Sequence, residues 1–174
     1  MKKWSSDRWM SLAAIIASLG TLFVIVYQTA IFRKQQYASV LPYLEMWNSN
    51  PGSKGTNYMF ILKNNGIGPA FIQEVKIHFD DSIYSLDPGR FTIDIIHPID
   101  SILNFGYTNI SKGSVVPAGE LIELVAVKND SINAPILRKW FQTMPNLEVE
   151  IIYASVYEER WSAKGSANQP VKLD

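Results

Sequence analysis

Residues 9–32 read WMSLAAIIASLGTLFVIVYQTAIF, an apolar run with no charged side chain, and Arg8 and Arg33 flank it. A helix rises about 1.5 Å per residue, so this run would reach roughly 36 Å, while the hydrocarbon core of a bilayer is about 30 Å thick. Its few polar residues are Ser, Thr and one Gln, whose side chains can bond to helix carbonyls or reach the membrane interface. The run therefore predicts one transmembrane helix.

Aromatic residues lie at both ends of the predicted helix, as membrane spans usually have them. Trp4 and Trp9 are at one end, and Tyr27 and Tyr37 are at the other. Small residues at four-residue spacing allow such helices to pair closely, and this spacing predicts homo-oligomerisation through Ala13, Ala17 and Thr21 as an alternative to a lone helix. The side chains expected to face lipid are Trp9, Leu12, Ile15, Ile16, Leu19, Leu22, Phe23, Ile25, Val26 and Tyr27.

Three other interpretations of the apolar run fit the sequence less well. A cleaved signal peptide has an apolar core of about 7–15 residues and a small-residue cleavage site, whereas Arg33-Lys34-Gln35-Gln36 follows this run. A buried core helix would show an amphipathic stripe, and an interfacial helix would carry a charged face. Length, flanks and aromatic residues together favour an uncleaved single-pass anchor.

The rest of the chain is long enough for one compact domain and is mildly acidic. Residues 1–34 contain five of the 16 Lys and Arg and one of the 16 Asp and Glu, which leaves 11 basic and 15 acidic residues, a net charge of −4. That sign gives no support to nucleic-acid binding, which requires a basic face. The chain has no Cys, which excludes a disulfide framework and thiolate metal sites.

Short runs of alternating apolar and polar residues, separated by Gly, Pro and Asn turns, predict antiparallel strands. The clearest alternation runs from Ala70 to Phe79. An amphipathic helix is expected behind Asp130, with Ile132, Ile136, Leu137, Trp140, Phe141 and Met144 on its apolar face. Further strands are expected at 42–47, 58–63, 83–86, 103–110, 121–127, 147–153 and Trp161, and residues 91–96 fit a strand or a short helix.

This order of elements predicts a mainly β fold, an antiparallel β-sandwich with one amphipathic helix, preceded by a single N-terminal transmembrane helix. Pro42 restricts the backbone of Leu41, so the anchor helix should end near Ser39 or Val40 and leave a short link to the sandwich. The expected domains are the flank and anchor at 1–39, the sandwich at 40–164 and a flexible tail at 165–174.

The sequence contains no P-loop, dinucleotide fingerprint, nucleophile elbow or zinc-protease motif. His78, Asp80 and Asp81 are the only candidates for a metal or catalytic cluster, but Asp is common in turns and His78 falls on the polar side of a strand. Glu158 and Glu159 are adjacent in a turn and do not converge as catalytic carboxylates must. No enzyme activity, metal or cofactor is predicted.

One turn is a candidate functional site because its backbone N–H groups could converge on an anion. No cluster of basic residues and no helix start accompanies the turn, so a structural role is the favoured interpretation. The residues of this candidate functional turn are Asn64, Asn65, Gly66, Gly68 and Pro69.

Three blocks of the chain resemble a group of small bacterial single-span membrane proteins. They are RKQQYASVLPYL at 33–44, KNNGIGPA at 63–70 and IYASVYEERW at 152–161. The resemblance covers most of the chain and implies a bacterial membrane protein with an N-terminal anchor and a β-rich domain. It brings no reaction, ligand or functional residue. Many sequences of this group have Gly at the position of Glu158.

The function expected from these observations is non-catalytic: binding or scaffolding of another protein at a bacterial inner membrane, in a stress or phage-defence system. The partners are the lipid bilayer and a protein. Lys2, Lys3 and Arg8 outnumber the basic residues after the span, which favours an extracytoplasmic body. The alternatives are a small-ligand or lipid receptor with an apolar pocket between the sheets, and a membrane-tethered enzyme.

Overall fold

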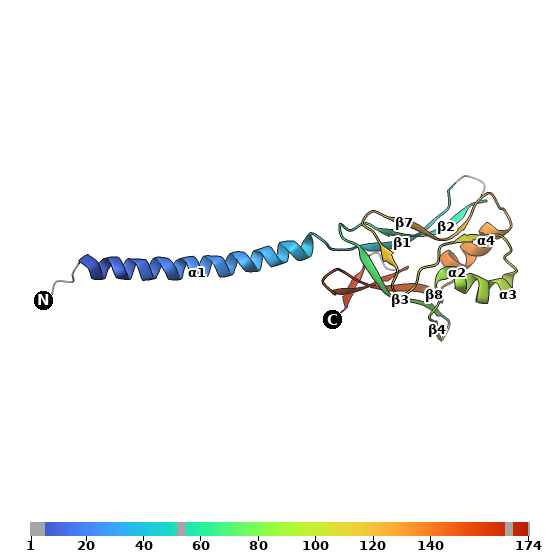
Figure 1. Ribbon diagram of the computed structural model, residues 1–174. Coiled ribbons are helices and arrows are strands. Elements are labelled where there is room, and N and C mark those ends of the chain that lie inside the picture. Colours follow the sequence, from blue (N-terminus) through green and yellow to red (C-terminus); the bar gives the residue numbers. More distant parts are fainter. Residues whose placement is uncertain (1–5, 52–54, 166–168, 174) are drawn as a thin grey trace. The chain divides into compact units, whose positions relative to one another are not determined.

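The computed structural model describes residues 6–51, 55–165 and 169–173 of the 174-residue chain. The chain forms two compact units, Met1–Ser39 and Val40–Asp174, which Figure 1 shows as a long helix and a β-rich body. Helix accounts for 35% and strand for 33% of the described residues, so the secondary structure of the chain is mixed, and a β-rich fold is consistent with it. The helical residues belong to the long helix and to two helical segments of the body.

The first unit is the helix α1, Ser6–Ala38, and none of its residues is buried. Its hydroxyl side chains bond back to the helix, as with Thr21 Oγ1 to the Ala17 carbonyl at 2.9 Å and Thr29 Oγ1 to the Ile25 carbonyl at 2.8 Å. Among the described helices, α1 is long and apolar enough to cross a membrane, and a signal sequence near the N-terminus would share these properties. It ends within two residues of the predicted position.

The first sheet of the body is antiparallel throughout. Its strand order is β1-β2-β7-β5, with bounds β1 Leu44–Ser49, β2 Tyr58–Asn64, β7 Leu121–Val127 and β5 Gly106–Tyr107. The strand predicted over 103–110 is therefore reduced to the two residues of β5, because the segment around it forms irregular coil.

The second sheet is also antiparallel and is built around the long strand β3, Ala70–Phe79, which pairs with β8, Leu147–Ala154. Val75 and Ile77 are buried on the apolar face that the alternation predicts, but Ile72 is buried in place of Phe71, because the strand register shifts between Ile72 and Glu74. The strand order is β10-β9-β8-β3-β4, and β6 pairs with the first residues of β3. The remaining strands are β4 Ser82–Tyr84, β6 Val115–Val116, β9 Arg160–Lys164 and β10 Val171–Leu173.

Part of the tail that was predicted to be flexible over 165–174 forms the strand β10, while residues 166–168 and 174 lie outside the described residues. The residues of β10 pair with β9, with Val171 opposite Ser162 and Leu173 opposite Arg160. The pairing involves backbone groups of the preceding strand, which the polar composition of the tail does not indicate.

Buried side chains from both sheets form one hydrophobic core cluster. Tyr153 of β8 joins the two sheets directly, because its hydroxyl accepts a hydrogen bond from the Leu44 backbone N–H of β1 at 3.3 Å, and burial raises the pKa of Tyr153 to about 12. Aromatic rings extend the core, with Phe60 stacked on Phe141 at 5.4 Å between ring centroids. The same region therefore contains residues of both sheets and of the helical segments.

Two helical segments lie at one end of the sheets in Figure 1. The first comprises α2, Pro88–Phe91, a π-helical stretch at Thr92–Ile96, and α3, His97–Asp100. The second comprises α4, Asn133–Arg138, and a π-helical stretch at Lys139–Thr143. The predicted amphipathic helix is thus present with Leu137, Trp140 and Phe141 buried, but Ile132 is 75% exposed, because it precedes the helix instead of lying on its apolar face.

Candidate functional site

The candidate turn is organised by the side chain of Asn64, which is fully buried at the end of β2. Its Oδ1 accepts hydrogen bonds from the backbone N–H groups of Tyr43 at 3.1 Å and Gly66 at 3.0 Å. Its Nδ2 donates to the carbonyls of Gly68 at 2.8 Å and Val116 at 3.0 Å. One amide thus joins three segments that are far apart in the sequence.

Glycine is required in this turn because the backbone of Val40–Tyr43 passes against it. A Cβ on Gly66 would lie 2.4 Å from the Leu41 carbonyl oxygen, and a Cβ on Gly68 would lie 1.9 Å from the Val40 carbonyl oxygen. Two backbones can approach this closely only where no side chain stands between them. The turn therefore holds the segment that follows α1 in the sequence.

The backbone donors of the turn are occupied within the body. The Asn65 N–H donates to the Tyr43 carbonyl at 2.8 Å, the Gly66 N–H to Asn64, and those of Ile67 and Gly68 to the Leu41 carbonyl at 3.1 and 3.4 Å. An anion would have to displace these bonds. The geometry accordingly favours the structural role of Asn64, Asn65, Gly66, Gly68 and Pro69.

The histidine and aspartates considered for catalysis are held in separate contacts. His78 Nε2 lies 3.0 Å from Glu150 Oε2 across the outer face of the second sheet. Asp80 has φ of 49° in the turn after β3 and accepts a hydrogen bond from Asn146 Nδ2 at 3.1 Å, while Asp81 is exposed. Within the described residues, no group of three or more His, Cys, Asp or Glu is arranged to hold a metal ion.

Glu150 is the centre of a polar cluster on that outer face. Burial alone would raise the pKa of Glu150, but hydrogen bonds from Ser162 and His78, with the charge of Lys164, outweigh it and leave the pKa below its usual value. Lys164 is in turn paired with Glu148 at 3.1 Å. Register brings these residues together from three strands, so the local sequence pattern did not reveal the cluster.

An open groove of about 680 Å³ lies beside the middle of β3. It is lined by residues 73–75, 85–87 and 110–112. The cations Arg90, Lys112 and Arg160 line it, and neither Lys112 nor Arg160 has a side-chain partner among the residues that the structure describes.

The two carboxylates of this groove are already engaged. Glu74 pairs with Lys76 at 2.8 Å, and Asp87 accepts the backbone N–H groups of Gly89 at 2.9 Å and Arg90 at 3.1 Å at the start of α2. The groove therefore offers uncommitted positive charge. Its three cations, Arg90, Lys112 and Arg160, are far apart in the sequence, so the sequence alone does not indicate that they lie together.

Large apolar side chains are exposed at both ends of the body. The proximal end is the one that contains Val40, and four exposed residues there, named the proximal rim, are Leu41, Ile67, Val156 and Tyr157. The distal end carries the helical segments. Three exposed residues there, named the distal patch, are Ile99, Leu103 and Ile132, with 60%, 81% and 75% of their surface accessible.

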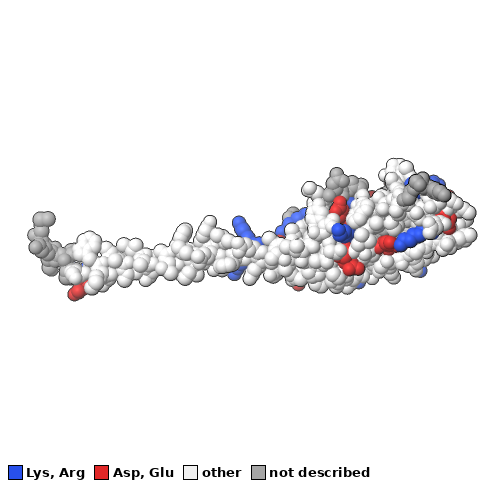
Figure 2. Space-filling model, turned by 90° about the horizontal axis from the view of Figure 1, so that it is seen from above, with Lys and Arg blue, Asp and Glu red and all other residues white. Residues whose placement is uncertain are grey.

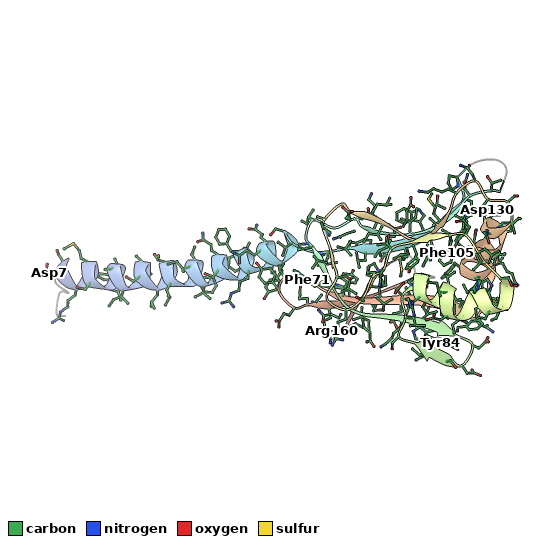
Figure 3. All side chains as sticks on the ribbon, turned by 45° about the vertical axis from the view of Figure 1, so that its right-hand side comes forward. Asp7, Phe71, Tyr84, Phe105, Asp130 and Arg160 are labelled. Atoms are coloured by element: carbon green, nitrogen blue, oxygen red, sulfur yellow. The ribbon has the colours of Figure 1, made fainter. Side chains whose placement is uncertain are left out.

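Hydrogen bonds hold the segments of the distal patch beside one another. The Leu103 backbone N–H donates to Asn133 Oδ1 at 3.2 Å, next to Ile132 in the chain. Trp140 Nε1 donates to Asp100 Oδ2 at 2.6 Å, next to Ile99. In Figure 3 the labelled Phe105 and Asp130 lie toward this end of the body, and Phe71 and Arg160 lie toward the proximal end.

The predicted lipid-facing residues all lie on α1 and are exposed. Figure 2 shows α1 without Lys, Arg, Asp or Glu over most of its length, with charge only toward its ends. The residues concerned are Trp9, Leu12, Ile15, Ile16, Leu19, Leu22, Phe23, Ile25, Val26 and Tyr27.

Comparison of the chain with protein-family models, with curated proteins and with solved structures found no match.

Proposed function

We propose that this protein is a non-catalytic binding module in which α1 spans a bacterial inner membrane once and the body binds another protein at the membrane surface. A helix of 33 residues with no buried residue is supported as a span by its apolar side chains and by hydroxyls that bond within the helix. The excess of basic residues before the span supports an extracytoplasmic body.

We further propose that the body is a β-sandwich. Two antiparallel sheets contribute buried side chains to a single core cluster, and Tyr153 bonds across from one sheet to the other. The buried and partly buried residues that alternate along β3 on either side of its bulge are typical of such packing. A rigid sandwich would present its end loops as a binding surface.

The distal patch carries the protein-binding part of the proposal. Ile99, Leu103 and Ile132 are aliphatic, largely exposed and held on adjacent segments. Burying one such side chain against a partner contributes about 1.5–3 kcal/mol, and grouped exposed apolar residues mark interaction sites. A protein partner supplies the apolar surface that these side chains would cover.

In vivo photo-cross-linking of the full-length protein tests this function. A photoreactive amino acid at Leu103 or Ile132 should give a discrete cross-linked protein. The same group at Val171, which is 60% exposed on β10, is the matched control and should give none. Ile99→Glu should abolish the product formed from position 103. Equal products from positions 103 and 171, or none from either distal position, would count against a partner at the distal patch.

The cationic groove supports a second candidate function, the binding of a small anionic ligand. This differs from the predicted receptor, which would have an enclosed apolar pocket between the sheets, because the groove is open and lined by Lys112 and Arg160. Phosphate or a small dicarboxylate should raise the melting temperature of the body. The variant with Lys112→Glu and Arg160→Glu should lose this shift. An unchanged melting temperature for the native chain would remove the candidate.

A further inference from the structure

We infer that the proximal rim is a second membrane-contacting surface, which inserts into the headgroup region of the bilayer that α1 spans. This inference rests on the proposed membrane span. Its occupant is a lipid surface, and its residues are Leu41, Ile67, Val156 and Tyr157.

The first support is the short connection between the span and the body. Helix α1 ends at Ala38, and the backbone of the body is already fixed at Val40–Tyr43 by the turn around Asn64. Successive Cα atoms are about 3.8 Å apart, so two residues extend less than about 8 Å. Whichever way the body turns, the part that contains Val40 cannot move far from the end of α1, which lies six residues beyond the apolar run 9–32.

The second support is that the rim residues belong to loops at the same end of the body. The Ile67 N–H bonds to the Leu41 carbonyl at 3.1 Å, which places the first two side chains on neighbouring backbones. Phe71 at the start of β3 pairs with Ala154 at the end of β8, and the turn that carries Val156 and Tyr157 follows directly. The apolar side chains therefore share one end of the sheets.

The third support is that backbone N–H groups in these turns are hydrogen-bonded within the body. The N–H groups of residues 65–68 all donate within the body. In the second turn, the N–H groups of Ser155, Tyr157 and Glu158 donate to Glu159 O, Ser155 Oγ and Ser155 O at 2.9, 3.1 and 3.1 Å. Loops entering the membrane interface lose water, and an unbonded N–H there is unfavourable. The N–H groups named here are therefore already bonded within the body before the turns contact lipid.

The charges around the rim are mixed in sign. Lys63 lies beside the first turn and Arg160 follows the second, while Glu45, Glu120 and Glu158 are carboxylates of the same end. Mixed charge gives no net attraction to anionic lipids, so apolar burial has to drive the insertion. We therefore expect shallow insertion whose depth does not depend on anionic lipid.

Site-directed spin labelling tests the inference on the full-length chain, because the native sequence has no Cys to interfere. Single Cys residues are introduced at Ile67 and Val156 and, as controls of similar or greater exposure, at Ile83 and Leu103. The labelled proteins are placed in phosphatidylcholine nanodiscs, with and without phosphatidylglycerol. Collision of each label with oxygen and with a water-soluble nickel chelate reports its depth.

Labels at positions 67 and 156 should show several-fold higher oxygen-to-nickel collision ratios than labels at 83 and 103, in both lipid compositions. Equal ratios at all four positions would overturn the inference, as would a high ratio seen only with phosphatidylglycerol. A further label at Phe23 of α1 separates the two proposals. If position 23 lies in lipid while 67 and 156 remain in water, the rim inference alone fails; if position 23 is in water, the membrane span itself fails.

Discussion

The Asn64 side chain accepts a hydrogen bond from the Tyr43 backbone N–H at 3.1 Å and thereby ties the turn after β2 to the segment that follows α1. The other polar groups of this amide bond to Gly66, Gly68 and Val116. A buried Asn with every side-chain group satisfied is a structural anchor for its neighbours.

Asn64→Ala should lower the free energy of unfolding of the body by about 3 kcal/mol. The substitution removes the Asn64 hydrogen bonds to the buried carbonyls of Gly68 and Val116 and to the partly buried Tyr43 N–H, and a buried polar group left unsatisfied costs about 1–3 kcal/mol. Denaturant unfolding of the full-length protein, followed by fluorescence of the buried Trp140 and Trp161, measures the change. Asn65→Ala is the control, since its side chain makes an exposed bond to Glu45; similar losses in both variants would refute the role of Asn64.

Gly68→Ala should destabilise the body by about 1–3 kcal/mol and expose the backbone of Val40–Tyr43 to hydrogen exchange. The new Cβ would meet the Val40 carbonyl oxygen at 1.9 Å, so the two backbones must separate. Gly106→Ala is the matched control, because its Cβ would approach nothing nearer than the Ala126 carbonyl oxygen at 3.9 Å. Unchanged exchange at residues 40–43 in the Gly68 variant would show that the close approach is unimportant.

The sequence pattern was sufficient where structure depends on near neighbours. The alternation in residues 70–79 predicted the strand β3 and, beyond the bulge near Gln73, its buried residues Val75 and Ile77, and the apolar run at 9–32 predicted a continuous helix. Pro88 at the start of α2 and Asp87 as its N-cap are helix-start signals, yet Asp-Pro-Gly also fits a turn, so the helical segment at 88–100 was only partly anticipated.

Features that depend on distant partners could not be predicted in this way. Asn64 looks like an ordinary turn residue until Tyr43 and Val116 are placed beside it. The same holds for Glu150, whose partners His78 and Ser162 come from neighbouring strands. The periodicity of apolar residues predicts which face of a strand a side chain lies on, but the register between strands determines which side chains it contacts.

Glu158→Gly should raise the free energy of unfolding by about 0.5–1 kcal/mol. Glu158 has φ of 63°, a left-handed conformation that is unfavourable for residues with a Cβ by roughly 1–2 kcal/mol, part of which glycine loses again through its greater freedom when unfolded. Glu159→Gly, one residue further on, is the control and should be neutral or destabilising. A loss of stability in the Glu158 variant would contradict the assigned strain.

Glu150→Gln should flatten the loss of stability of the body in acid. The pKa of Glu150 in the folded protein lies below its usual value near 4.5, because the hydrogen bonds from Ser162 and His78 and the charge of Lys164 outweigh the opposing effect of burial. In the window between these two values the unfolded chain binds more protons than the folded one. The stabilisation is therefore present above the unfolded-state pKa and is lost as the pH falls through the folded-state pKa.

Denaturant unfolding between neutral pH and about pH 3 measures this effect, since that range includes the usual carboxylate pKa values. Asp100 and Asp130 also have lowered pKa values, through hydrogen bonds from Trp140 and from Asn133 respectively, so the Gln variant should keep part of the slope. Asp81→Asn, in an exposed turn, is the control and should follow the native profile. An acid slope that is identical in the native and Glu150→Gln proteins would mean that the cluster on the second sheet does not favour the ionised carboxylate.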